Sequence, residues 1–302
     1  MRIGFIGLGK MGGPICGHLI DNGHDVAVHD VLEDATKEIC GKGGRFCTSS
    51  KDVAMKSEII FLSLPHPDIS CDVIGGENGV LAGLQPGTII AETSTVSPGL
   101  IQELGPDVAE KGGELLDSAV SGGVHGAVAG TLTLMVGGSG AGFDRLRPVL
   151  SCFGKNIYHC GESGMGMLFK VINNMIGHVN FVAMAEGMAL GVKAGADARL
   201  LGDVISVSSG CSAQFGDRLE KHILPGNFSP GMTMELATKD SLLCLELARD
   251  LGVPTFITSA AHHVYEMGLA KGYGGEDYAA LIKLWEEWLD IEVRDRGVGG
   301  GK

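Results

Sequence analysis

Two polar side chains, Lys170 and Asn174, interrupt a long apolar segment of the chain. They are four residues apart, so a helix would place them on one face. Burying a lysine is costly unless its charge is paired or used in chemistry. Burial and a neighbouring positive charge would lower its pKa from about 10.4 towards about 7–8, where it can take a hydroxyl proton. The alternative is that Lys170 reaches solvent at the helix start and Asn174 is a packing amide.

A second candidate site is the segment DSAVSGG, which covers residues 117–123 and follows an apolar strand. The consecutive backbone N–H groups of Ser121, Gly122 and Gly123, together with the Ser121 hydroxyl, could form a nest for a carboxylate. A plain glycine loop is the alternative. Further along, Lys239 and Asp240 lie in an amphipathic helical segment. A surface ion pair is the usual explanation, but Lys239 is also a candidate second cation beside a cofactor or substrate.

The chain opens with MRIGFIGLGKMGG, a glycine fingerprint directly behind an apolar strand and ahead of a helical segment. In such a turn Gly7 permits the tight bend, Gly9 lets the backbone approach a pyrophosphate, and Gly12 lets helix and strand pack closely. The helix N-terminus supplies N–H groups for the phosphates. Asp30, at the end of the second strand, can accept hydrogen bonds from a ribose diol and would repel a 2′-phosphate. The pattern predicts a dinucleotide site that favours NAD over NADP; the alternative is a glycine-rich turn without a ligand.

The elements that must position these residues divide the chain in two. In residues 1–162, near-continuous apolar strands alternate with helical spacing, which predicts a mostly parallel, doubly wound Rossmann-type α/β sheet. The strands are expected at 2–6, 26–30, 59–64, 88–92, 114–118, 132–136 and 156–159.

Beyond about residue 162 the periodicity is helical only, so residues 163–296 are predicted to form an all-α domain for substrate binding and oligomerisation. Its helices are expected near 164–195, 198–207, 212–223, 234–251, 255–271 and 276–290. The first of them is apolar nearly all round, which predicts a buried helix. The tail, residues 297–302, is expected to be disordered.

Composition and net charge argue against several classes of partner and site. A net charge of −13 over 302 residues argues against nucleic acid or an anionic membrane as a partner. The eight cysteines are scattered without a CxxC pair, which predicts reduced thiols in a cytoplasmic protein and no zinc or other metal site. A strand starting at residue 2 leaves no room for a signal peptide. The most apolar stretch, 178–196, contains Glu186 and Lys193, so no membrane span is expected.

Together these segments resemble the β-hydroxyacid dehydrogenase family, which includes 3-hydroxyisobutyrate dehydrogenase, tartronate semialdehyde reductase and 2-(hydroxymethyl)glutarate dehydrogenase. The resemblance covers essentially the whole chain, in the family's order and spacing. GFIGLGKMG is similar to the family's cofactor loop, DSAVSGG to its substrate loop, and Gly164–Asn174 to its GxGxxxKxxNN segment. Lys239-Asp240 matches a C-terminal Lys-Asp motif. Ser118 and Ala119 depart from the usual Ala-Pro, His66 from Asn or Thr, Met232 from Phe, and Cys211 from the Arg of several relatives.

The resemblance implies an all-α C-terminal domain like that of 6-phosphogluconate dehydrogenase, and a homodimer or homotetramer. It implies Lys170 and Asn174 as catalytic residues and Ser121, Gly122 and Gly123 as holders of the substrate carboxylate. The implied cofactor-binding residues are Gly7, Leu8, Gly9, Lys10, Met11, Gly12, Asp30, Leu64, Pro65, Thr95 and Lys239.

The expected function is NAD-dependent oxidation of a 3-hydroxy acid resembling 3-hydroxyisobutyrate to its semialdehyde, or the reverse reduction. Alternatives within the family are 2-(hydroxymethyl)glutarate dehydrogenase and tartronate semialdehyde reductase activity. Imine reductases as a class lack the lysine at the position of Lys170. An alternative from another class is a non-catalytic dinucleotide-binding module, which would be expected to lose that lysine.

Overall fold

The computed structural model describes residues 1–295, and the tail predicted to be disordered, 297–302, lies outside them. The chain divides into two compact units, Met1–Val171 and a second unit from Ile172 onward. The division lies inside one helix, because the first turns of that helix pack against the first unit.

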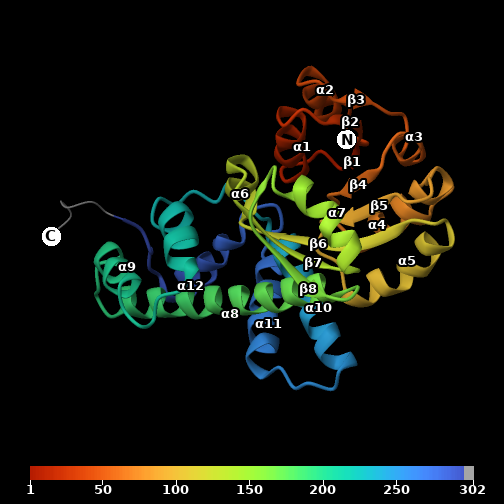
Figure 1. Cartoon of the computed structure of the whole chain (residues 1–302). Helices are drawn as coiled ribbons and strands as arrows, with labels where there is room; N and C mark the ends of the chain where they lie inside the picture. The colour runs from red at the N-terminus through yellow and green to blue at the C-terminus, as the bar shows by residue number, and fades with distance from the viewer. Residues whose placement is uncertain (296–302) are drawn as a thin grey trace. The chain divides into compact units, whose positions relative to one another are not determined.

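The first unit is built around one sheet with the strand order β3-β2-β1-β4-β5-β6-β7-β8 (Figure 1). All neighbours are parallel except β6 and β7, which are antiparallel. The strands are β1 (Arg2–Ile6), β2 (Asp25–His29), β3 (Arg45–Phe46), β4 (Ile59–Leu62), β5 (Ile89–Glu92), β6 (Glu114–Ser121), β7 (Leu132–Gly137) and β8 (Gly154–Gly161). The sequence did not predict β3, because two exposed residues carry no alternating pattern.

Helices cover both faces of this sheet, because the strands present apolar side chains alternately to each side. The elements that cover it are α1 (Gly12–Asp21), α2 (Glu33–Gly41), α3 (Ser50–Met55), α4 (Pro67–Gly75), η1 (Val80–Ala82), α5 (Pro98–Glu110), α6 (Gly123–Ala129), α7 (Gly140–Leu150) and the start of α8 (Met165–Lys193). One core joins the strands to α1, α2 and α7, and the other joins them to α3, α4, α5 and the start of α8. The Rossmann-type prediction is confirmed.

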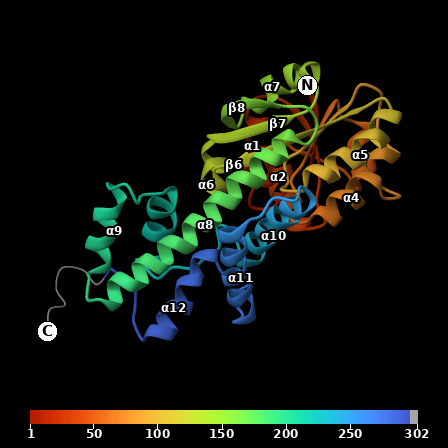
Figure 2. The ribbon, with the colours of Figure 1, turned by 90° about the horizontal axis from the view of Figure 1, so that it is seen from below.

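The second unit is helical throughout its described residues. It contains most of α8 (Met165–Lys193), α9 (Ala198–Ser206), a π-helical segment η2 (Phe215–Ile223), α10 (Met234–Asp250), α11 (Phe256–Ala270), η3 (Tyr278–Leu281) and α12 (Ile282–Leu289). The helices α10 and α11 run side by side (Figures 1 and 2). The core gathers residues of α8 between Phe181 and Ala189 with Tyr265 and Tyr278.

The long helix α8 is unbroken over 29 residues (Figure 2). The prediction that it is buried all round is wrong: Phe169, Ile172, Ile176 and Leu190 are between 43% and 71% exposed. Its neighbours within the two units therefore leave part of its apolar circumference in contact with water. Among the helices of residues 1–295, α8 is the one whose length and apolar composition would allow it to cross a membrane. Its buried residues belong to the cores of the two units, as in a core helix.

All eight cysteines are free thiols, and their environments differ sharply. Burial raises the pKa of the Cys16 and Cys244 thiols to about 12, whereas Cys211 is exposed. Because the thiolate is the reactive form, we expect a thiol reagent at mildly alkaline pH to modify Cys211 first and Cys16 and Cys244 only on unfolding. Mass-spectrometric mapping of the labelled native protein checks this, and labelling of Cys16 as fast as Cys211 would contradict it.

Candidate active site

The turn between β1 and α1 is closed so tightly that two of its glycines cannot carry a side chain. Gly7 has φ +93°, and a Cβ there would lie 2.2 Å from the Ser63 carbonyl oxygen. A Cβ on Gly12 would lie 1.9 Å from the Gly7 carbonyl oxygen. At Gly9, by contrast, an added Cβ would meet nothing within 4 Å. The loop therefore leaves open space beside Gly9, which fits a backbone that admits a pyrophosphate at the start of α1.

Asp30, directly after β2, holds this loop in place. One carboxylate oxygen accepts a 2.6 Å hydrogen bond from the Leu8 N–H, and the other accepts a 2.7 Å bond from the Leu32 N–H. Each carboxylate oxygen has two lone pairs, so both still have capacity for a ribose hydroxyl. The side chain thus has a structural role that the sequence did not reveal, besides the predicted one in nucleotide binding.

A chain of hydrogen bonds orders the loops that follow β4 and β5. The Leu64 N–H donates to the Ser94 Oγ at 2.7 Å, and the Ser94 N–H donates to Oε1 of Glu92 at 2.8 Å. Glu92 is 1% exposed. These loops carry Leu64, Pro65 and Thr95, and they leave the same edge of the sheet as the glycine loop because β1, β4 and β5 are parallel. Sequence analysis did not single out Glu92, although an acidic residue at the end of an apolar strand is a pattern that could have identified it.

The predicted substrate loop leaves that same edge at the end of β6, which is parallel to β5. Gly122 has φ +130° and Gly123 has φ +61°, conformations that favour glycine, and α6 begins at Gly123. Both glycines are exposed, and Ser121 is half-buried. The first unit therefore gathers the predicted cofactor loops and the predicted carboxylate loop along one edge, where open α/β sheets bind ligands.

Lys170 and Asn174 lie one turn apart on α8, as predicted. Lys170 is half-buried and belongs to the first unit. Asn174 is buried in the second, where its amide donates a 2.6 Å hydrogen bond to Oδ2 of Asp240. Lys239 forms an ion pair of 3.0 Å with Oδ1 of the same carboxylate, with side-chain exposures of 16% and 4%. The Lys239–Asp240 pair is therefore a largely buried pair that also orients Asn174, and not a solvated surface pair.

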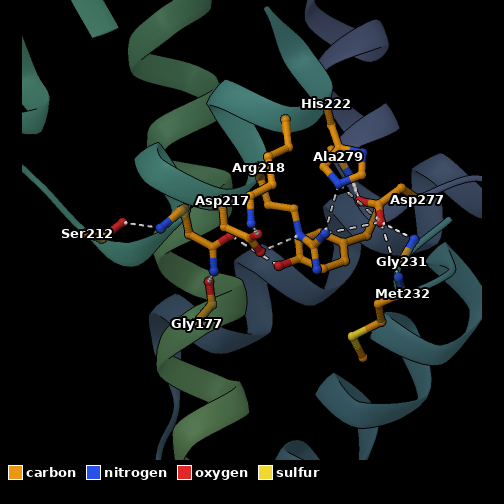
Figure 3. A network of polar contacts seen from close by, with 12 residues as sticks. Gly177, Ser212, Asp217, Arg218, His222, Gly231, Met232, Asp277 and Ala279 are labelled. Atoms are coloured by element: carbon orange, nitrogen blue, oxygen red, sulfur yellow. Dashed lines mark hydrogen bonds and ion pairs between the residues drawn. The ribbon is translucent and has the colours of Figure 1, made fainter. Parts of the chain in front are cut away.

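A second network in this unit fixes the segment that leads into α10, which carries Lys239 (Figure 3). Oδ2 of the fully buried Asp277 accepts hydrogen bonds from the N–H groups of Gly231 at 2.9 Å and Met232 at 3.1 Å. It also pairs with Nη1 of Arg218 at 3.2 Å, and the Arg218 guanidinium lies 4.3 Å from the centre of the Tyr278 ring. Removing one partner of such a buried pair costs about 3–5 kcal/mol. Sequence reasoning missed Asp277 and Arg218, because their pairing spans 59 residues.

Among residues 1–295, no cluster of three His, Cys, Asp or Glu side chains could hold a metal ion.

Known proteins resemble this chain over most of its length. Residues 2–161 match the family described as the NAD binding domain of 6-phosphogluconate dehydrogenase. Residues 164–285 match the family described as NAD-binding of NADP-dependent 3-hydroxyisobutyrate dehydrogenase. The 2-(hydroxymethyl)glutarate dehydrogenase of Eubacterium barkeri is 41% identical over 293 residues, 97% of each chain.

Two further matches agree with these. The probable mitochondrial 3-hydroxyisobutyrate dehydrogenase of Dictyostelium discoideum is 35% identical, over 92% of this chain and 89% of that protein. The crystal structure of 3-hydroxyisobutyrate dehydrogenase from Salmonella typhimurium is similar with a TM-score of 0.87 at 28% identity, covering 94% of this chain and 99% of that one.

The geometry of Asp30 predicts how the cofactor site responds to substitution. We expect Asp30→Asn to weaken NADH binding by about 10- to 100-fold, because the ribose hydroxyls and the Leu8 and Leu32 N–H groups lose a charged acceptor. NADPH binding should weaken less, because a negative charge is removed. Fluorescence titration with both nucleotides measures this. Asp34→Asn, at a fully exposed acid on α2, is the matched control. Unchanged NADH binding by Asp30→Asn would contradict the assignment.

Proposed function

The chain belongs to the β-hydroxyacid dehydrogenase family, and we propose that it oxidises a 3-hydroxy acid resembling 3-hydroxyisobutyrate to the semialdehyde, or reduces the semialdehyde, with Lys170 exchanging the proton. The protein is an NAD-dependent dehydrogenase. The observation that carries the proposal is the half-buried Lys170 one turn before Asn174, whose amide is held by the buried Asp240. A lysine on a largely apolar helix beside an oriented amide suits proton transfer better than packing.

Bound NAD⁺ supplies the hydride acceptor for the carbinol carbon. The chain's own residues then have separate tasks. Ser121 and the N–H groups of Gly122 and Gly123 bind the substrate carboxylate. Lys170, as the neutral amine, takes the hydroxyl proton in the oxidation and returns it in the reduction. Asn174 orients the hydroxyl group, and Lys239 contributes positive charge near the cofactor or substrate.

The substrate side chain separates the candidates within the family. A substrate with two carboxylates, such as 2-(hydroxymethyl)glutarate, needs a second cation. In the second unit Arg218 is paired with Asp277, and position 211 is a cysteine. These features support a monocarboxylate as the preferred substrate, while the 41% identity to the Eubacterium barkeri enzyme favours the dicarboxylate. Turnover of 3-hydroxyisobutyrate, glycerate, 4-hydroxybutyrate and 2-(hydroxymethyl)glutarate with NAD distinguishes them.

We expect Lys170→Ala to lower kcat/KM on the best substrate by about 10²- to 10⁴-fold, the range that general acid–base catalysis supplies. NADH affinity should stay within about two-fold, because the predicted cofactor loops do not include this residue. Lys193→Ala, a substitution of the exposed lysine at the other end of α8, is the matched control and should keep full activity. Steady-state kinetics and NADH titration provide both measurements.

Three results would redirect this proposal. Activity of Lys170→Ala within a few-fold of the unsubstituted enzyme would remove the lysine from the mechanism. NADH binding without turnover of any substrate in the panel would favour the non-catalytic binding module. Turnover confined to the dicarboxylate would favour a 2-(hydroxymethyl)glutarate dehydrogenase.

We also propose that the protein forms a homodimer or homotetramer through its helical unit. The support is a set of exposed apolar side chains in that unit, which a monomer would leave in water. They are Ile176, Leu190, Leu200, Val204 and Val207, from 52% to 89% exposed.

We also propose a cytoplasmic location and the absence of nucleic-acid or membrane partners, supported by the free thiols and the net charge of −13.

Light scattering coupled to size exclusion should give two or four times the chain mass of 31.4 kDa. Leu190→Glu combined with Val207→Glu should shift the mass towards the monomer, because charged groups cannot be buried in an apolar interface without large cost. Val128→Glu, at an exposed apolar residue of the first unit, is the control. A monomeric mass for the unsubstituted protein at micromolar concentration would contradict the proposal.

A further inference from the structure

Asp117 is a fully buried acid on β6 that none of the predicted roles uses. It lies on the face of the sheet that is covered by α5 and by the first turn of α8. Oδ1 accepts a 2.8 Å hydrogen bond from the Gly164 N–H, and Oδ2 accepts a 2.7 Å bond from the Met167 N–H. The Gly166 N–H also bonds to this carboxylate. One side chain of the sheet therefore satisfies the N–H groups at the start of α8, which helices otherwise leave without partners.

The carboxylate lies against two glycines, at positions that have no space for a side chain. A Cβ on Gly137 of β7 would lie 2.5 Å from Oδ1 of Asp117. A Cβ on Gly166 would lie 2.4 Å from the Met135 carbonyl oxygen and 2.8 Å from Oδ2 of Asp117. The start of α8 is thus in direct backbone contact with the sheet, and position 166 has no space for a side chain.

The groups around Asp117 come from strands β5, β7 and β8. Glu92 is its register partner on β5, Gly137 is its partner on β7, and Cys160 lies near it on β8. Burial raises the pKa of the Asp117 carboxyl, and the hydrogen bonds from the α8 backbone act in the opposite direction. The positive end of the α8 dipole at this point also favours a negative charge.

Two of the proposed active-site residues lie a few positions along the chain from the groups that this carboxylate joins. Ser121 follows Asp117 along β6 by four residues, about 13 Å of strand. Lys170 follows Met167 along α8 by three residues, about 4.5 Å of helix. Because the Asp117 carboxylate joins β6 to α8, it sets where the Lys170 amine lies relative to the Ser121–Gly123 loop.

We propose that Asp117 is a positioning residue of the reaction, which holds Lys170 at the distance from the Ser121–Gly123 loop that the substrate requires. This inference rests on the proposed function of Lys170. Misplacement of a reacting group by about 1 Å can cost about 10²-fold in rate, so a looser helix start should slow the chemical step and leave cofactor binding intact.

The same strand provides an internal control. Glu114, three residues earlier on β6, accepts a 3.1 Å hydrogen bond from the Ser139 N–H, at the residue before α7. A Cβ on Gly142 would lie 2.5 Å from its Oε2, so this carboxylate also lies against a glycine that has no space for a side chain. The helix α7 carries none of the proposed active-site residues. Glu114 therefore stabilises a helix start without connecting it to catalysis.

The test compares Asp117→Asn with Glu114→Gln on the best substrate of the panel, with and without deuterium at the carbinol carbon. For Asp117→Asn we expect kcat to fall about 10- to 100-fold and the isotope effect on kcat to rise, with the NADH dissociation constant within about two-fold. For Glu114→Gln we expect a smaller fall in Tm, because this half-buried carboxylate accepts one backbone bond, together with kcat within about two-fold and an unchanged isotope effect. A smaller kcat with normal NADH binding and a larger isotope effect is not expected of a purely structural role.

A second variant covers the case in which Asp117→Asn does not fold. Gly166→Ala keeps the carboxylate but pushes the start of α8 away from β7, and it should give the same fall in kcat. Equal kcat for Asp117→Asn and Glu114→Gln, or full kcat for Gly166→Ala, would overturn the positioning role. If Lys170→Ala also remains active, the proposed function of the lysine fails as well; if Lys170→Ala is inactive, only the positioning role fails.

Discussion

Backbone N–H groups at the functional edge of the sheet need acceptors, and carboxylates on or directly after the strands supply them. Asp30 after β2 accepts the N–H groups of Leu8 and Leu32. Glu92 on β5 accepts that of Ser94, and Asp117 on β6 accepts those at the start of α8. Loops and a helix start cannot be left with unsatisfied N–H groups in a buried setting. These charge-assisted bonds therefore keep the predicted site ordered before any ligand arrives.

In the helical unit, buried carboxylates likewise hold hydrogen-bond donors in place, but these donors include side chains. Asp240 holds the Asn174 amide and the Lys239 ammonium, and Asp277 holds two backbone N–H groups and Arg218. Each buried acid has several donors, so its desolvation is compensated. The polar groups proposed to act on substrate are consequently supported by acids that themselves need not touch it.

Prediction from sequence succeeded where local pattern decides structure. The strands and helices of the Rossmann unit follow from apolar runs, and the glycine loop follows from positions where Cβ atoms would collide, as at Gly7 and Gly12. It failed for β3, whose two residues are too few to carry a period. It also failed for the burial of α8, because periodicity shows that a helix is apolar but not which side its neighbours cover.

The sequence by itself determined the fold class, the dinucleotide loop and the placement of Lys170 and Asn174 on one helical face. Each of these follows from patterns of apolar, glycine and polar residues along the chain. Only the tertiary structure decided that Lys239 and Asp240 form a buried pair, that Asp277 orders the entry to α10, and that Asp117 ties β6 to α8. Asp117 bonds to N–H groups 47 and 50 positions away, and Asp277 pairs with Arg218 across 59 positions. Asp240 is adjacent to Lys239 in the sequence, but it also holds the Asn174 amide from 66 positions away. No local spacing encodes them, because the folded chain creates the proximity.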